Sequence, residues 1–260
     1  MHGDGITFLG HSTLLIEVGG ARLLTDPVLT ERIGHIRRIV PAPSGDVECD
    51  AVLISHGHHD HLQLKSLRRV PRGVPVIAPA GSARVVRRWT QHEVVEVAPG
   101  DRVPVGAAEV VVTPAEHDGR RLPFGPPQPA VGFHVRGTSS VLFFGDTDVF
   151  DGMRDLAGDL DVALLPIWGW GAHTGPGHMD PERAAQAAAL LAPRIAVPIH
   201  WGTLAGPGAW LRADPGMPAR RFAECLAAHA PAVTPRIVAP GDRLELSPGS
   251  SPSAPRTPPP

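Results

Sequence analysis

Residues 55–62 of the chain, SHGHHDHL, place four histidines and one aspartate within a single short segment. Imidazole nitrogens and carboxylate oxygens are ligands that zinc accepts, and a catalytic zinc site keeps an open position for water. A histidine tract is also typical of metal-binding tails and of surfaces that sense pH. Residues on either side of the tract, and three distant ones, decide between these alternatives.

Four candidate ligands stand where apolar runs end. DAVLIS leads into His56, EVVVTPAE into His117, SVLFFG into Asp146 and RIAVPI into His200. Short apolar runs of this kind are typical of buried strands. Strand ends on a rigid sheet are where precise, water-accessible sites are usually built. A solvated histidine tract would have no such relation to distant strands, so the pattern favours a catalytic centre.

The spacing of the motif divides it between two ions. In an extended chain, alternate residues lie on the same side, which groups His56 with His58. Asp60 and His61 follow after a turn that we expect Gly57 to permit, and they approach from another direction. The neighbouring His59 then faces away from the ions. The predicted ligands are His56, His58 and His117 for one ion, Asp60, His61 and His200 for the other, and Asp146 as a bridge between them.

Two zinc ions about 3.5–4 Å apart would share a water, lower its pKa and stabilise both the attacking and the leaving oxygen. The sequence therefore predicts a dinuclear zinc hydrolase whose metal-bridging hydroxide attacks an ester, lactone or phosphodiester. Asp60 is expected to orient this hydroxide as well as to bind metal. Manganese is an alternative ion, because geometry and availability select the metal as much as affinity does.

The motif H-x-H-x-D-H at 56–61, with the later His117, Asp146 and His200, resembles the metallo-β-lactamase superfamily of metal-dependent hydrolases. More narrowly, GHSTLLIEVGGARLLTDPV, PAEHDGRR, HMDPERA and IHWGTL resemble a branch of that superfamily. The branch includes N-acylphosphatidylethanolamine-hydrolysing phospholipase D and L-ascorbate 6-phosphate lactonases. The resemblance implies an α/β protein, a four-layer αββα sandwich with the metal site at one edge of its sheets. It also implies that Asp26 supports the ligands from outside through a hydrogen bond.

The chain departs from the phospholipase pattern in two respects. Asp118 stands where an aromatic residue usually follows the histidine, and we find no long membrane-binding N-terminal extension. We therefore do not transfer the phospholipid substrate. Loops 118–130 and 168–178 are expected to build the pocket, and their sequences do not define what binds there.

Two further histidines resemble family positions that line the pocket. His178, just before a predicted helix, is a candidate to contact substrate or to donate a proton to the leaving group. His11, in the turn GHST, is a candidate supporting residue. Either ring is equally suited to a hydrogen bond with backbone in its turn. A glycine-rich loop contains Trp168, Trp170 and His173. The sequence does not decide whether this loop forms a wall of the pocket or only packs against the protein.

Composition narrows the possible partners and location. A formal charge of −2 and a pI of about 6.7 give no electrostatic reason to expect nucleic acid or an anionic membrane. Most of the arginine pairs at 37–38, 68–69, 87–88, 120–121 and 220–221 are expected to lie on the solvated surface. No apolar run approaches the ~20 residues of a membrane span, and the N-terminus lacks a signal-peptide pattern. We expect a cytoplasmic protein with a small-molecule substrate.

Hydrophobic residues make up 42% of the 260 positions, which is enough for a sizeable core. TLLIEV and ARLLT around Gly19-Gly20 predict a hairpin. Helices are predicted at 81–89, 180–192 and 217–230, the second capped by Asp180. Cys49 and Cys225 are expected to be buried, reduced thiols. We predict one domain over residues 1–246 and a disordered Pro/Ser-rich tail over 247–260.

Three rival functions differ in features that can be read from the chain. Redox di-iron members of the superfamily have a carboxylate at the position of His58 and a flavodoxin-like domain. We find neither feature in this sequence. Nucleases of this fold carry an additional domain that clamps nucleic acid. A non-enzymatic metal-binding protein predicts no hydrolysis, although every ligand position is filled here.

Overall fold

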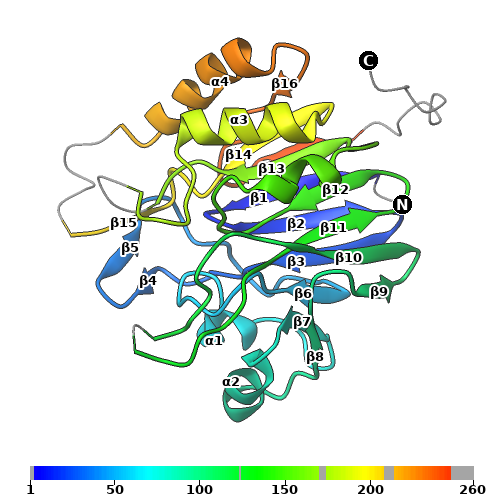
Figure 1. The fold of residues 1–260 in the computed structure, drawn as a ribbon. Coiled ribbons are helices and arrows are strands. Elements are labelled where there is room, and N and C mark those ends of the chain that lie inside the picture. Colours follow the sequence, from blue (N-terminus) through cyan, green and yellow to red (C-terminus); the bar gives the residue numbers. More distant parts are fainter. Residues whose placement is uncertain (1–2, 123, 170–173, 208–213, 247–260) are drawn as a thin grey trace.

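The computed structural model of the chain describes residues 3–122, 124–169, 174–207 and 214–246. Two seven-stranded sheets form its centre, and helices lie on the outer side of each sheet (Figure 1). This layering confirms the predicted αββα class. The predicted tail at 247–260, Trp170 and His173 lie outside the described residues. None of the helices in the described ranges is long and apolar enough to cross a membrane.

The first sheet contains the predicted hairpin at its centre. Its strands, in spatial order, are β17 (Arg243–Glu245), β1 (Gly5–Gly10), β2 (Thr13–Val18), β3 (Ala21–Thr25), β6 (Ala51–Leu53), β7 (Val76–Pro79) and β8 (Val94–Val97). Neighbouring strands are antiparallel from β17 to β3 and parallel from β3 to β8. As a result β1, β3 and β6 all end at the same edge of the sheet.

The second sheet is mixed in the same way. Its order is β16 (Thr234–Pro235), β14 (Ile195–Ile199), β13 (Val162–Pro166), β12 (Ser140–Phe143), β11 (Val131–Arg136), β10 (Ala108–Pro114) and β9 (Arg102–Val105). Strands β9 to β12 are antiparallel neighbours, and β12 to β16 are parallel. Strands β10, β12 and β14 therefore run in one direction. A small third sheet consists of β15 (Leu204–Ala205), β5 (Ile36–Arg38) and β4 (Arg32–Ile33).

Two apolar clusters hold the layers together. The larger one fills the space between the sheets with side chains such as Phe8, Phe133 and Phe143, and it extends to α3 (Pro181–Leu191) and α4 (Met217–His229). The smaller one, with Leu24 and Val52, packs the first sheet against α1 (Leu64–Leu67) and α2 (Ser82–Trp89). A short 3₁₀ helix, η1, spans Asp151–Leu156.

The predicted cap of α3 is confirmed. The side chain of Asp180 accepts a hydrogen bond from the backbone nitrogen of Arg183 at 2.9 Å, and Pro181 occupies the first turn. This cap satisfies a backbone N–H that has no partner within the helix. It also fixes where the chain leaves the preceding loop, which contains His178.

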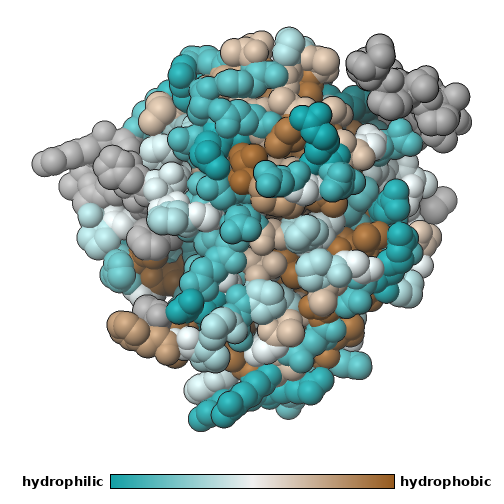
Figure 2. Space-filling model, in the orientation of Figure 1, coloured by the Kyte–Doolittle hydropathy of each residue, from teal (hydrophilic) through white to brown (hydrophobic). Residues whose placement is uncertain are grey.

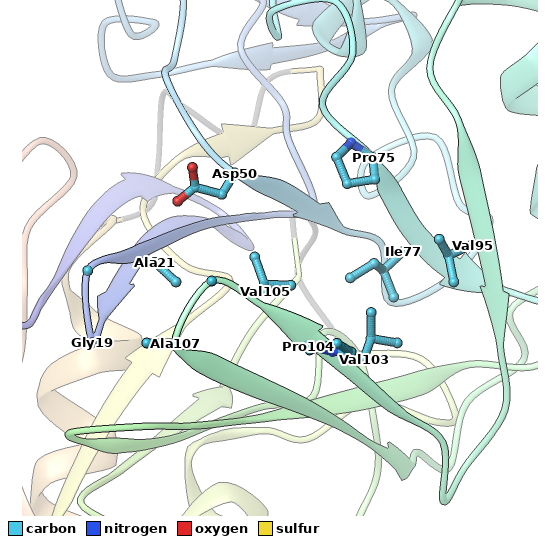
Figure 3. Close-up of a pocket in the computed structure, with 12 residues that line it drawn as sticks. Gly19, Ala21, Asp50, Pro75, Ile77, Val95, Val103, Pro104, Val105 and Ala107 are labelled. Carbon is cyan, nitrogen blue, oxygen red and sulfur yellow. The ribbon is translucent and has the colours of Figure 1, made fainter.

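A groove of about 480 Å³ lies where β3 begins, at the end of that strand opposite Asp26 (Figure 3). Apolar residues such as Ile77, Val103 and Val105 line it. Asp50 is the one titratable side chain among its described lining residues, and its Oδ2 accepts a hydrogen bond from the backbone of Arg22 at 2.7 Å. The groove thus offers no group of reactive side chains, in contrast to the opposite ends of the strands.

Candidate metal centre

The strand ends deliver the candidate ligands at regular offsets. His56, His117 and Asp146 each stand three residues after the last residue of β6, β10 and β12, respectively. His200 directly follows β14. Two supporting residues follow their strands just as closely, because His11 comes immediately after β1 and Asp26 immediately after β3.

Backbone strain is concentrated at this edge. Four non-glycine residues in the described part of the chain have positive φ: His11 (59°), Asp26 (33°), Ala192 (47°) and His200 (66°). Ala192 ends helix α3, where the left-handed conformation is common. The other three belong to the candidate centre. Strained backbone persists where the surrounding structure over-determines it, and it is enriched at functional sites.

The first group of ligand atoms combines both sheets. Nε2 of His56 lies 2.9 Å from Nδ1 of His58, and Nε2 of His117 lies 3.2 Å from the same Nδ1. Oδ2 of Asp146 is 3.9 Å from Nε2 of His56. Ligand atoms of these four residues all lie within 4.8 Å of one another. The structure therefore brings together the residues predicted for the first ion, with Asp146 beside them.

The second group shares Asp146 with the first. Nε2 of His61 and Nε2 of His200 are 3.3 Å apart, and each lies 3.1 Å from an oxygen of Asp146. Oδ2 of Asp60 is 3.9 Å from Nε2 of His61 and 3.1 Å from Nε2 of His11. His11 thus has a ligand atom within this group, although we expected it only to support the ligands.

A buried network orients His56 and His61. The carboxylate of Asp26 accepts hydrogen bonds from the backbone nitrogen of Ser55 (2.7 Å), from Ser55 Oγ (2.5 Å) and from Nδ1 of His61 (2.7 Å). Because Ser55 Oγ donates to Asp26, it accepts from Nδ1 of His56, 2.9 Å away. The structure therefore places the carboxylate of Asp26 against the candidate ligand His61 and against Ser55, the neighbour of His56. The part played by Ser55 was not predicted.

Two more histidines are oriented by carbonyl oxygens. Nδ1 of His117 lies 2.8 Å from the carbonyl oxygen of Gly177, and Nδ1 of His200 is hydrogen-bonded to that of Trp168. A carbonyl oxygen only accepts, so each of these ring nitrogens carries its hydrogen. In a neutral ring the other nitrogen, Nε2, then presents a lone pair to the centre.

These assignments leave lone pairs facing lone pairs. Nε2 of His200 is 3.1 Å from Oδ1 of Asp146, and this buried oxygen has no hydrogen-bond partner. Nε2 of His61 lies at the same distance from Oδ2 of Asp146, to which the protonated ring donates a hydrogen bond in the absence of metal. Acceptors this close repel one another unless a cation or a proton lies between them. The donor set of imidazole and carboxylate, together with this orphaned oxygen, fits divalent metal ions.

The electrostatics favour positive charge at the same place. Burial lowers the pKa of His61, but the carboxylates of Asp146, Asp26 and Asp60 outweigh it and raise that pKa well above its ordinary value. Burial raises the pKa of Asp60 and Asp146, but the neighbouring histidines outweigh it and hold both pKa values well below the usual range. Both aspartates therefore remain ionised, although Asp146 is buried and only 15% of the Asp60 side chain is exposed.

His178 lies beside this centre. Its Nε2 is 3.3 Å from Oδ2 of Asp146, and its Nδ1 lies 3.1 Å from the carbonyl oxygen of Pro176. Burial lowers its pKa, but the hydrogen bond to Asp146 and the charge of that carboxylate outweigh burial and raise it. About a quarter of the side chain is exposed (25%), so the ring connects the centre to solvent.

Gly57 is required here for close packing and not, as we had predicted, for a special turn conformation. Gly57 is not among the glycines with positive φ, so no special turn conformation requires it. A Cβ at this position would stand 2.7 Å from the carbonyl oxygen of Gly119, which accepts a hydrogen bond from the Gly57 nitrogen at 3.0 Å. Close backbone packing excludes a side chain here. His59 is exposed and outside both ligand groups, with its Nδ1 3.2 Å from Arg121.

Gly145 is a second glycine whose part was missed. It adopts φ +69°, and a Cβ there would meet Ser55 Oγ at 2.2 Å. Gly145 thus leaves the space that Ser55 fills. One signal in the sequence could have indicated this contact. Ser55 and Gly145 each immediately precede a candidate ligand, His56 and Asp146, respectively.

Comparison with known proteins agrees with this geometry. Residues 21–201 match the family described as the beta-lactamase superfamily domain. A UPF0173 metal-dependent hydrolase of Opitutus terrae is 33% identical over 259 residues, covering 93% of this chain and 99% of its own. Igni18, a metallo hydrolase of Ignicoccus hospitalis, has a similar fold, with TM-score 0.70, 24% identity and coverage of 95% and 99% of the two chains.

A redox enzyme also shares the fold. CmlA, a diiron beta-hydroxylase of Streptomyces venezuelae, superposes with TM-score 0.69 at 22% identity, covering 95% of this chain and 55% of its own. At this identity the similarity extends to the fold alone.

The αββα sandwich with histidines and aspartates at one edge defines a metal-dependent hydrolase of the metallo-β-lactamase fold. Within that class, the chain belongs to the beta-lactamase superfamily and to its UPF0173 metal-dependent hydrolases.

Proposed function

We propose that the protein is a dinuclear, zinc-dependent hydrolase that cleaves an ester, a lactone or a phosphodiester of a small molecule. The observation that carries the proposal is the convergence of Nε2 of His61 and Nε2 of His200 on the two oxygens of Asp146, each at 3.1 Å. His56, His58 and His117 would hold one ion, Asp60, His61 and His200 the other, and Asp146 both. When bound, the ions would lower the pKa of a water and polarise the bond to be cleaved.

The side chains of the chain itself have three further tasks. Asp60, whose Oδ2 lies 3.1 Å from Nε2 of His11, would orient the attacking hydroxide. His178, at the exposed side of Asp146, is placed to donate a proton to the leaving oxygen. Asp26 and Ser55 keep the rings of His56 and His61 in their orientation and tautomer.

The substrate class follows from the narrower resemblance to the lactonase and phospholipase branch. That resemblance supports an oxygen ester or phosphodiester as the bond that is cleaved. We do not propose a phospholipid substrate, because Asp118 replaces the aromatic residue of that pattern and pairs with Arg120 at 2.8 Å. Manganese is the second candidate metal. A cytoplasmic location remains part of the proposal.

Metal analysis and a substrate panel test this function. Protein purified without chelator should contain two transition-metal ions per chain, and it should hydrolyse a member of a panel of lactones, phosphodiesters, phospholipids and thioesters. Asp146→Ala should abolish this hydrolysis. Asp148→Ala is the matched control, since this neighbouring carboxylate pairs with Arg183 and belongs to neither ligand group. Less than one ion per chain, or activity that survives Asp146→Ala, would refute the proposal.

A redox di-iron enzyme is the second candidate, favoured by the fold shared with CmlA. His58 argues against it, because redox members of the superfamily characteristically have a carboxylate there. An iron absorption band together with oxygen consumption would decide for this candidate.

A further inference from the structure

The segment that follows the metal-binding motif is strongly basic. Between Asp60 and Glu93 the sequence has no Asp or Glu, while it has seven basic residues: Lys65, Arg68, Arg69, Arg72, Arg84, Arg87 and Arg88. Because the whole chain has a formal charge of −2, this segment concentrates positive charge that the rest of the molecule does not share. In the structure the segment contains α1, β7 and α2, at the lower end of the molecule in Figure 1.

A groove of about 900 Å³ lies beside this segment, between α2 and the loop of residues 118–130. Its described lining contains no Asp or Glu. Apolar surface and arginines alternate along it, and the residues that matter here are Leu64, Val85 and Leu122 together with Arg84, Arg88 and Arg121. Arg84 and Arg88 are exposed and one helical turn apart on α2. The groove therefore matches a ligand that is both apolar and anionic.

Large apolar side chains stand in solvent around the same groove. The exposed fractions are 51% for Trp89, 58% for Leu122 and 102% for Phe124. Single exposed hydrophobic residues are ordinary, but a group of them beside a groove marks a contact surface. Figure 2 shows hydrophilic residues gathered over α2 at the lower end of the molecule. Hydrophobic residues are visible at the lower left, where Figure 1 places the loop of residues 118–130.

The groove is connected to the metal-binding motif through Arg121. Its Nη1 donates to the carbonyl oxygens of Gly57 and Leu62, both at 2.9 Å, and its Nη2 lies 3.2 Å from Nδ1 of His59. One wall of the groove is thus the outer side of the loop that carries His58. None of the candidate ligand residues is among the described lining of the groove.

We propose that this surface docks the protein reversibly on an anionic lipid bilayer. Arg84 and Arg88 lie at the level of the headgroups and contact their anions, while Trp89, Leu122 and Phe124 enter the apolar boundary. Basic residues near an anionic leaflet and amphipathic side chains at the interface are the two contributions that hold peripheral proteins on membranes. A nucleic acid fits less well, because the aliphatic Leu122, Leu64 and Val85 give bases nothing to stack on or to hydrogen-bond with, although Trp89 and Phe124 are aromatic.

Vesicle sedimentation tests this docking on the full-length protein. The protein should sediment with vesicles of phosphatidylcholine mixed with an equal amount of phosphatidylglycerol, and it should stay in solution with phosphatidylcholine alone. Added salt should release it, because exposed charges are screened. The double variant Arg84→Glu/Arg88→Glu should bind at least about 25-fold more weakly, since each basic residue near an anionic surface contributes about a factor of five.

Matched variants keep the test specific. Arg220→Glu/Arg221→Glu makes the same charge change on exposed residues of α4, at the other end of the molecule, and should bind as wild type does. Leu122→Ser/Phe124→Ser should lose binding, whereas Met217→Ser/Ile237→Ser, which alters exposed apolar residues elsewhere, should not. Brominated acyl chains should quench tryptophan fluorescence, and Trp89→Phe should remove that quenching.

Three results would overturn the proposal. The wild type does not sediment with the mixed vesicles, the α2 and α4 charge variants lose vesicle binding equally, or Leu122→Ser/Phe124→Ser binds the vesicles as tightly as the wild type. In the last case, equally tight binding to heparin would identify a general polyanion surface instead.

Discussion

At the scale of single residues, the centre depends on groups that never touch an ion. Ser55 Oγ accepts from Nδ1 of His56 and donates to Asp26, which also accepts from His61. One hydroxyl thus connects a ligand of the first group to the residue that orients a ligand of the second. Partners of this kind fix the ring tautomer and increase the basicity of the ligand nitrogen.

Ser55→Ala should therefore weaken metal binding by about 10- to 100-fold, because His56 loses the group that holds its Nδ1 hydrogen outward. Competition with a chromophoric chelator measures this change. Ser139→Ala is the control, since Ser139 is also buried and also donates to a carboxylate, that of Asp4, at 2.7 Å. Equal metal affinity in wild type and Ser55→Ala would show that the network does not orient His56.

His134 predicts a pH dependence that does not involve the centre. Burial, with a smaller contribution from Arg136, lowers its pKa to about 4, while Nε2 contacts Ser140 Oγ at 2.7 Å. In the unfolded chain the pKa of this histidine is about 6.5. Between about pH 4 and pH 6.5 the unfolded state is therefore protonated at His134 while the folded state is not. Stability from this residue is complete above about pH 6.5 and is lost as the pH falls toward 4.

His134→Gln, which keeps a hydrogen-bonding side chain, should reduce that loss. Urea unfolding at pH 7 and pH 5 measures the difference, and the variant should lose less free energy of unfolding than the wild type between the two conditions. Parallel losses in the two proteins would contradict the lowered pKa.

At the scale of elements, the loop 56–61 is shaped by its neighbour. The nitrogen of Gly57 donates to the carbonyl oxygen of Gly119, and Arg121 bonds the carbonyls of Gly57 and Leu62. The loop after β10 therefore clamps the motif from outside. Since His117 lies on the same connection, the two sheets meet through this contact.

Gly57→Ala should lower the free energy of unfolding by about 1–3 kcal/mol, because the added Cβ overpacks the Gly119 backbone. Metal affinity should fall with it, as His56 and His58 flank the displaced residue. Thermal unfolding and metal titration measure both effects. Gly158→Ala is the control, since a Cβ there meets nothing within 4 Å. If Gly57→Ala is as stable as Gly158→Ala, the Gly119 backbone can move to accommodate a side chain at position 57, and close packing does not require glycine there.

The sequence predicted those elements whose signal is local. The hairpin at Gly19-Gly20, helix α3 with its Asp180 cap and the buried strands before His56 and His200 all form as expected. The grouping of distant ligands was predictable because strand ends meet at one edge. The Ser55–Gly145 contact and the approach of Gly119 to Gly57 were not, because each joins residues about 60 or more positions apart and leaves no local pattern.

At the scale of the whole molecule, the ligands come from both sheets. His56, His58 and His61 follow a strand of the first sheet, whereas His117, Asp146 and His200 follow strands of the second. Bound ions would therefore connect the two halves of the sandwich. Without them, the ionised Asp60 and Asp146 remain among the histidines, and the buried Oδ1 of Asp146 has no hydrogen-bond partner.

Removal of metal should consequently lower the melting temperature. Each ion present at about 1,000 times its Kd would contribute about 4 kcal/mol to the free energy of unfolding. Differential scanning calorimetry of metal-free and reconstituted protein measures this contribution. Asp146→Ala should show a smaller difference between the two forms. Identical melting curves for metal-free and reconstituted wild type would argue against ions that bind both sheets.

The pairing of β17 with β1 has a consequence for how the protein is made. Residues 243–245 form the outermost strand of a sheet that otherwise comes from the first hundred residues, with Glu245 opposite Gly5. During translation, the backbone of β1 therefore waits with an open edge until nearly all of the described chain has left the ribosome. An open edge is a template for pairing with another chain. The nascent protein is thus most prone to aggregate before β17 has emerged from the ribosome and paired with β1.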